Sequence, residues 1–168
     1  MLPSQIIIKL FTIFVFMNRI VRQYRFKKDV KYGEYGETII KGFLESQGMV
    51  FHSVNRDYRY DLKMFYPATN KFYTYEIKTD FYENTGNILI EFESRGKKTG
   101  ITITEADYFL TFFYKQGEIW NISTDKLKFL INYLNPGFFK MSGDKGSNTK
   151  LFCFKKKRVK RFFKIHKI

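Results

Sequence analysis

Apolar residues recur at spacings of three and four positions in one stretch near the start of the chain. This spacing predicts an amphipathic helix over residues 37–47, which Gly33-Glu-Tyr-Gly36 opens and Gly48 can terminate. The apolar positions of the predicted helix are Ile39, Ile40, Phe43 and Leu44.

Beyond Gly48 the apolar period changes to two, which indicates β-strands. The turn composition Pro67-Ala-Thr-Asn70 separates two strands rich in Tyr and Phe and predicts a hairpin. The order of helix, several strands, a second helix and a late strand predicts an α/β sandwich. We expect strands at 49–54, 58–66, 71–79, 87–93, 107–115, 118–122 and 151–154, turns at 55–57 and 116–117, a short helix or turn at 104–106, and a helix at 125–134.

The composition narrows the class of protein. A length of 168 residues fits one domain, and a net charge of +14 with a pI near 9.7 favours an anionic partner such as nucleic acid or an acidic membrane surface. The alternative is that lysine merely serves as the default solvated residue. The single cysteine excludes an internal disulfide and fits an intracellular setting, in the cytoplasm or a host cell. The two histidines lack partners at zinc-ligand spacing.

Three regions are expected: an N-terminal leader or basic extension (1–30), a central domain (31–154) and a basic C-terminal tail (155–168). The apolar run Ile6–Phe16 is shorter than the roughly 20 residues that span a bilayer, so stable membrane insertion is not expected. A leader or docking strand is favoured over a signal peptide or anchor. The tail fits binding to DNA phosphates, with a nuclear import signal and a membrane-surface segment as alternatives.

The hairpin carries the candidate chemistry. In its second strand Glu76 and Lys78 share one face, and closure around Asn70 would bring Asp61 close to them. Carboxylates gathered at a strand end suit Mg²⁺ or Mn²⁺, and the lysine can orient or deprotonate a water molecule or offset phosphate charge. The plainer interpretation is a surface ion pair on a solvated sheet face.

The order of these charged residues along the chain resembles the PD-(D/E)XK nuclease superfamily: first Gly36-Glu37 on the first helix, then Asp61, and then Glu76-Ile-Lys78. The stretch GNILIEFESRGKKTGITITEADYFLTF (86–113) is similar to a segment of phage and large-virus nucleases of this group. The resemblance covers about 33–154 and implies a restriction-endonuclease-like fold, a mixed central β-sheet flanked by helices in αβββαβ order. It departs at one position, since Tyr60 stands where the family name has proline.

The resemblance implies that Asp61, Glu76 and Glu37 bind Mg²⁺ or Mn²⁺ and that Lys78 is the catalytic lysine, with Glu34 a rival to Glu37. The expected function is a metal-dependent deoxyribonuclease that hydrolyses DNA phosphodiester bonds through a metal-activated water. The alternative is a catalytically inactive, basic nucleic-acid-binding protein on the same fold. Nicking, end resection and junction resolution stay open, and so does a homodimer, because resolvases of this group work as dimers.

Further charged residues are candidates for contacts around this site. Glu91 and Glu93 lie on the polar face of a predicted strand, where they could bind a second metal or substrate, or simply neutralise lysines. Two glycines let the backbone of the loop at 94–100 approach phosphate. The predicted DNA-binding residues are Arg95, Lys97, Lys98, Lys155, Lys156, Lys157 and Arg158.

Overall fold

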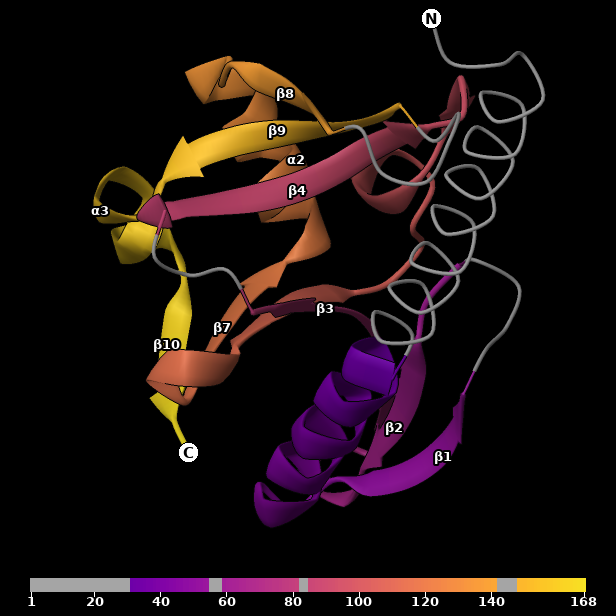
Figure 1. Ribbon diagram of the computed structural model, residues 1–168. Coiled ribbons are helices and arrows are strands. Elements are labelled where there is room, and N and C mark those ends of the chain that lie inside the picture. Colours follow the sequence, from indigo (N-terminus) through magenta and orange to yellow (C-terminus); the bar gives the residue numbers. More distant parts are fainter. Residues whose placement is uncertain (1–30, 55–58, 82–84, 142–147) are drawn as a thin grey trace, which may run out of the picture. The chain divides into compact units, whose positions relative to one another are not determined.

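The computed structural model describes residues 31–54, 59–81, 85–141 and 148–168 (Figure 1). The chain divides into two units, Met1–Tyr32 and Gly33–Ile168, and the elements described below belong to the second. The predicted N-terminal extension and the predicted turn at 55–57 lie outside the described residues. No helix in the described part is long and apolar enough to cross a membrane.

A six-stranded sheet, here called sheet A, forms the centre of this unit. Its order is β1-β2-β3-β6-β7-β10, and β3 pairs with β6 in parallel whereas the other neighbours are antiparallel. The predicted mixed sheet is therefore confirmed. Its strands are β1 (Val50–Val54), β2 (Leu62–Tyr66), β3 (Lys71–Asp80), β6 (Tyr108–Phe113), β7 (Glu118–Ser123) and β10 (Lys164–Lys167).

A smaller antiparallel sheet, sheet B, has the order β5-β4-β9-β8. Its strands are β4 (Asn87–Ser94), β5 (Lys97–Lys98), β8 (Phe138–Met141) and β9 (Thr149–Lys155). The helical residues are 31–46, α2 (Thr124–Leu134) and α3 (Lys156–Val159), and the 3₁₀ turns are η1 (Pro67–Thr69), η3 (Gly100–Thr102), η4 (Tyr114–Gln116) and η5 (Lys160–Phe162).

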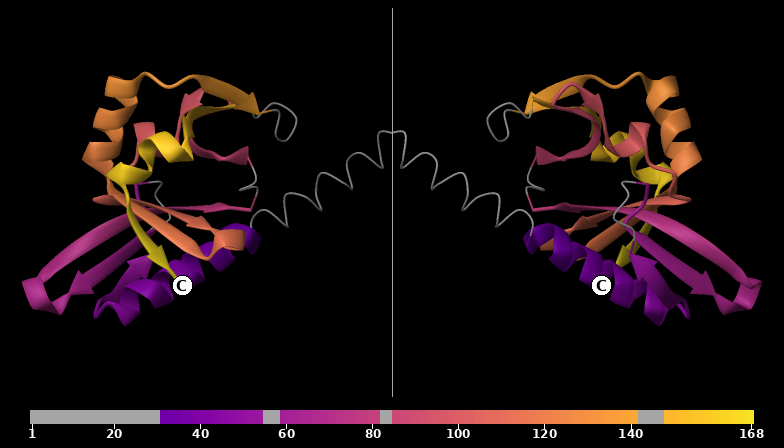
Figure 2. Two further views of the ribbon diagram at one scale, coloured as in Figure 1. Left: turned by 90° about the vertical axis from the view of Figure 1, so that its left-hand side faces the viewer. Right: turned by 90° about the vertical axis from the view of Figure 1, so that its right-hand side faces the viewer.

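Two hydrophobic cores cover the two faces of sheet A. On one face, Ile40 and Leu44 of the first helix pack with Tyr75 and Ile77 of β3. On the other face, Phe109, Phe113 and Trp120 pack with residues of sheet B and α2, as well as with Val159 and Phe163. Figure 2 shows the first helix and sheet B on opposite sides of sheet A. The order of layers is thus helix, sheet A, and then sheet B with α2.

Local patterns account for most of these elements. The predicted hairpin is confirmed: Tyr66 pairs with Lys71, and Asn70 adopts the left-handed conformation that the turn needs (φ 54°). The predicted second helix corresponds to α2, and Asn135 ends it with φ 41°. The first helix begins earlier than predicted, since residue 31 is already helical.

Three expectations need correction or remain predictions. Residues 104–106 are not helical; the nearby helical turn is η3, which ends at Thr102. Between β3 and β6 the described elements are β4, β5 and η3, where an αβββαβ order would place a helix, so the restriction-endonuclease-like order remains a prediction. Residues 155–168, set apart as a tail, contribute the last residue of β9 together with α3, η5 and β10, which pairs with β7.

Candidate active site

Strand β3 is longer than its neighbour β2, and the candidate site forms where β2 stops. Pairing between β2 and β3 ends at Leu62 opposite Tyr75, whereas β3 continues beside β6 as far as Asp80. Along 76–80, β6 is the only described strand that pairs with β3. Glu76 and Lys78 lie on this stretch, so side chains from other segments can approach them along the open edge.

Asp61 occupies this edge directly before β2. Its backbone N–H donates to the Tyr75 carbonyl at 2.8 Å, and its Oδ2 accepts a hydrogen bond from the Ile77 N–H at 2.6 Å. The carboxylate therefore satisfies a backbone donor of β3 that β2 is too short to reach. Ile77 lies between Glu76 and Lys78, so the predicted approach of Asp61 to these residues is confirmed.

Glu76 and Lys78 form a close ion pair, with Lys78 Nζ 2.7 Å from Glu76 Oε1. Glu76 is only 6% exposed, whereas the Lys78 side chain is 39% exposed, so the carboxylate of the pair is buried and the lysine side chain reaches solvent. A pair with a buried carboxylate differs from the exposed ion pair of the plainer interpretation. Removal of one partner of a buried pair typically costs about 3–5 kcal/mol, because the other charge is left uncompensated.

Thr104 completes the surroundings of Glu76 and was missed by the sequence analysis. This buried hydroxyl lies 3.1 Å from Glu76 Oε2 and 2.9 Å from the Arg59 carbonyl, and its single hydrogen can serve either acceptor. The Glu105 N–H also donates to the Arg59 carbonyl, at 2.8 Å. These bonds hold the segment before Asp61 against the one before β6. No local sequence signal identifies one threonine as the partner of a glutamate 28 positions away.

Glu37 reaches the cluster because the helix backbone approaches β3 closely at the preceding residue. Gly36 is buried, and a Cβ added there would lie 1.7 Å from Thr79 Oγ1 and 2.9 Å from Thr79 Cβ. Only glycine permits this approach. The half-buried Glu37 then interacts electrostatically with Asp61, Lys78 and Glu76.

Glu37 and Asp61 hold their protons more tightly than usual, because the pKa of each is raised. Burial, followed by repulsion from Asp61, raises the pKa of Glu37, although Lys78 opposes the shift. Burial also raises the pKa of Asp61, to which Glu76 adds, while Lys78 and the Ile77 N–H act in the opposite direction. Burial is thus the first cause of both shifts, and repulsion between the carboxylates adds to it.

Lys78 remains a cation. Burial alone would lower its pKa, but the fields of Glu76 and Asp61 and the hydrogen bond to Glu76, with a smaller contribution from Glu91, raise it above its ordinary value. A lysine with a raised pKa is protonated at neutral pH. Of the three roles considered for Lys78, orienting water and offsetting phosphate charge fit this state, whereas deprotonating water does not.

The donor set fits a hard divalent cation. Glu37, Asp61 and Glu76 offer only carboxylate oxygens, which Mg²⁺ and Mn²⁺ prefer, and a cation would relieve the repulsion that raises two of their pKa values. In the described part of the chain, no three acidic, histidine or cysteine side chains already form a compact metal-binding group. Glu76 meets Lys78 with one oxygen and Thr104 with the other, so metal binding requires a rearrangement of this side chain.

The two additional glutamates differ in their surroundings. Glu93 pairs with Lys150 at 2.7 Å, which matches the neutralising role considered for it. Glu91 contributes to the field at Lys78 and therefore lies within electrostatic range of the cluster.

The predicted DNA-binding residues form two separate groups. Arg95, Lys97 and Lys98 are exposed at the β4–β5 turn, and Arg95 adopts φ 53°. The second group lies at the opposite end of β4, because Lys98 pairs with Glu93 whereas Lys155 pairs with Asn87. Lys155, Lys157 and Arg158 are exposed.

Lys156 has different surroundings from the other cations of the second group. Its Nζ lies 3.5 Å from the centre of the Phe113 ring, and the residue is half-buried. This position fits a cation–π contact within the fold more closely than a phosphate contact at the surface.

Comparison with models of known protein families, with curated proteins and with solved structures found no match.

Proposed function

We propose that this protein is a Mg²⁺- or Mn²⁺-dependent deoxyribonuclease of the PD-(D/E)XK type, with Glu37, Asp61, Glu76 and Lys78 as its active site. The observation that carries the proposal is the 2.7 Å Glu76–Lys78 pair at the open edge of β3, electrostatically coupled to Asp61 and Glu37. The parallel pairing of β3 with β6 after a helix and three antiparallel strands supports the fold assignment.

Each residue has a distinct part in the proposed hydrolysis. Glu37, Asp61 and Glu76 would hold the divalent cation, which when bound supplies an acidified water and neutralises phosphate charge. Protonated Lys78 donates hydrogen bonds to the phosphate or to the attacking water. Water adds to phosphorus and releases a proton to solvent, and one backbone P–O bond breaks as its leaving oxygen takes a proton from a second water. Two strand ends form, one with a phosphate and one with a hydroxyl.

Binding of the DNA backbone is the proposed role of the two exposed basic groups. A net charge of +14 favours a polyanion. The exposed side chains at the β4–β5 turn and at the end of β9 would contact phosphates without reading bases. Affinity should then fall steeply with salt, by a log–log slope of roughly 0.9 per neutralised phosphate.

The test is incubation of supercoiled, linear and branched DNA with the purified protein and Mg²⁺ or Mn²⁺. We expect the wild type to cleave at least one substrate, and EDTA, Glu76→Gln and Asp61→Asn to prevent cleavage. Glu45→Gln is the matched control, because Glu45 forms only an exposed ion pair with Lys41 at 3.9 Å on the first helix. Equal cleavage by Glu76→Gln and the wild type would show that the proposed site is wrong.

A catalytically silent DNA-binding protein would give a different result in calorimetry. The proposed enzyme should bind Mn²⁺ and lose this binding in Asp61→Asn. DNA binding without Mn²⁺ binding and without cleavage would favour the silent protein.

A further inference from the structure

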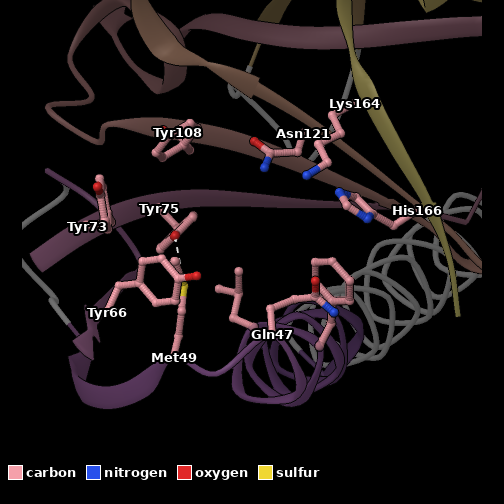
Figure 3. Close-up of a pocket in the computed structure, with 11 residues that line it drawn as sticks. Gln47, Met49, Tyr66, Tyr73, Tyr75, Tyr108, Asn121, Lys164 and His166 are labelled. Carbon is pink, nitrogen blue, oxygen red and sulfur yellow. Dashed lines mark hydrogen bonds between the residues drawn. The ribbon is translucent and has the colours of Figure 1, made fainter. Parts of the chain in front are cut away.

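A cavity of about 350 Å³ opens on the helix face of sheet A, the face opposite Glu76 and Lys78. Its size lies in the range of small-molecule sites, roughly 300–1,000 Å³. Figure 3 shows the labelled tyrosines gathered on one side of the cavity and Asn121, Lys164 and His166 on the other. The cavity therefore has an aromatic side and a polar side. The four tyrosines that line it are Tyr66, Tyr73, Tyr75 and Tyr108.

The strand register explains this arrangement. Tyr75 of β3 lies beside Tyr108 of β6, and Asn121 of β7 lies directly opposite Lys164 of β10. Because side chains alternate between the faces of a sheet, His166 joins Lys164 on this face, whereas Ile165 packs into the core on the other. The end of the first helix closes the cavity with Phe43, Leu44 and Gln47.

The aromatic side offers flat surfaces for stacking. The ring centres of Tyr75 and Tyr108 lie 5.7 Å apart in a stacked arrangement, and those of Tyr73 and Tyr108 lie 5.9 Å apart. Tyr75 is fully buried and its hydroxyl donates to Met49 Sδ at 3.2 Å, so this ring is fixed. Tyr73 and Tyr108 are half-buried and expose ring surface. A planar aromatic ligand would stack here, as nucleic-acid bases do on tyrosine.

On the polar side of the cavity, a ligand could provide a hydrogen-bond partner for Asn121 and a negative charge for Lys164. Asn121 Oδ1 is buried, and no hydrogen-bond partner for it is found among the described residues. A buried acceptor without a partner costs about 1–3 kcal/mol, so a rotation of the Asn121 amide that presents Oδ1 to a ligand N–H in the cavity would be favoured. Lys164 is exposed, and none of the described residues that line the cavity is acidic. Burial, followed by the charge of Lys164, lowers the pKa of His166, so this ring is neutral at pH 7.

We propose that this cavity binds a nucleotide, with its base against Tyr73 and Tyr108, a base N–H on Asn121 and its phosphate on Lys164. A nucleotide combines the flat ring, the donor and the anion that the two sides of the cavity require. The ligand could be a free mononucleotide or an unpaired nucleotide at a strand end, which share this chemistry. The inference does not depend on the proposed nuclease activity, because the cavity lies on the opposite face of sheet A from Glu76 and Lys78, and none of the four proposed active-site residues lines it.

Calorimetry with the full chain in EDTA tests the proposal with dAMP, dCMP, dGMP and dTMP, deoxyadenosine and inorganic phosphate as probes. We expect dAMP to bind about tenfold more tightly than deoxyadenosine, because its phosphate can bind Lys164. Tenfold corresponds to the low end of the free energy that a hydrogen bond to a charged group contributes. Lys164→Gln should remove this difference. Lys167→Gln is the matched control: Lys167 is exposed on the same strand but does not line the cavity, so dAMP binding should be unchanged.

Asn121→Leu tests the base contact. Loss of an acceptor without a partner should keep or raise the melting temperature while weakening dAMP binding about tenfold. A single-stranded oligonucleotide and the blunt duplex of the same sequence separate the two sources. If the single strand binds in a Lys164-dependent way and mononucleotides bind weakly, the site is assigned to strand ends. If mononucleotides bind in a Lys164-dependent way and the single strand binds weakly, the site is assigned to free nucleotides. Failure of all nucleotide probes to bind, or binding unaffected by both Lys164→Gln and Asn121→Leu, would overturn the proposal.

Discussion

Replacement of Gly36 by alanine tests how the first helix is positioned. In an exposed helix interior, glycine to alanine stabilises by about 1 kcal/mol. At position 36 the new Cβ would lie 1.7 Å from Thr79 Oγ1, so the threonine side chain must rotate. Because the new Cβ would also lie 2.9 Å from Thr79 Cβ, where ordinary contact begins at 3.4 Å, helix and strand must separate by several tenths of an ångström as well. Overpacking of this kind costs about 1–3 kcal/mol, which offsets or exceeds the gain in helix propensity. We expect Gly36→Ala to lower the free energy of unfolding by up to about 2 kcal/mol.

The same separation should also reduce activity. Glu37 follows Gly36 directly. Since a displacement of about 1 Å at a catalytic group can cost roughly 100-fold in rate, a shift of several tenths of an ångström should lower the rate by roughly tenfold. Urea denaturation monitored by fluorescence of the buried Trp120 measures the first effect, and DNA cleavage under conditions where the variant is folded measures the second.

Gly42→Ala is the matched control for this experiment. Gly42 lies in the same helix, is exposed and has no atom within 4 Å of an added Cβ. Its replacement should stabilise by about 1 kcal/mol and leave cleavage unchanged. If Gly36→Ala stabilises the protein as much as Gly42→Ala does, the close approach of helix and β3 is refuted.

Two further changes probe the cluster around Glu76. Thr104→Val should lower the free energy of unfolding by about 1–3 kcal/mol, because the carbonyl of Arg59 and the carboxylate of Glu76 lose their donor, and Thr104→Ser should restore it. Urea titration measures this change, and an unchanged midpoint for the valine variant would argue against the Thr104 bridge. In EDTA, Asp61→Asn should be more stable than the wild type at pH 7 but not near pH 3. The reason is that the pKa of Asp61 is raised in the folded state, so the wild-type protein loses stability as pH rises from the ordinary value of 3.8 toward the folded-state pKa. Melting temperatures across this range measure the difference, and a wild type that gains stability over the variant with rising pH would contradict the assigned shift.

Local patterns predicted the first helix, the hairpin and the faces of β3. The period of two placed Tyr75 and Ile77 on the opposite face from Glu76 and Lys78, and the two cores of sheet A confirm this alternation. The approach of Asp61 to β3 followed from hairpin closure alone, because both strands are close in sequence.

Features that depend on distant pairing could not be predicted in this way. Strand β4 pairs with β9 more than 55 residues later, and no local period indicates that partner. The run of lysines and arginines near the C-terminus concealed Val159 and Phe163, which are buried in the core. Long cationic side chains can hold their charges in water while apolar neighbours pack inside. The basic composition of this segment therefore predicts a tail, whereas in the structure the segment supplies β10.

The most direct test of the proposed active site is the single-turnover rate of DNA cleavage by Lys78→Met compared with Lys150→Met in saturating Mg²⁺. Both lysines form an ion pair of 2.7 Å with a glutamate, but Lys78 pairs with Glu76 in the acidic cluster and Lys150 pairs with Glu93 in sheet B. Loss of one donor that stabilises the transition state costs about 100- to 1,000-fold, which we expect for Lys78→Met, whereas Lys150→Met should cleave at nearly the wild-type rate. Equal rates for the two variants would contradict the assignment of Lys78 to catalysis.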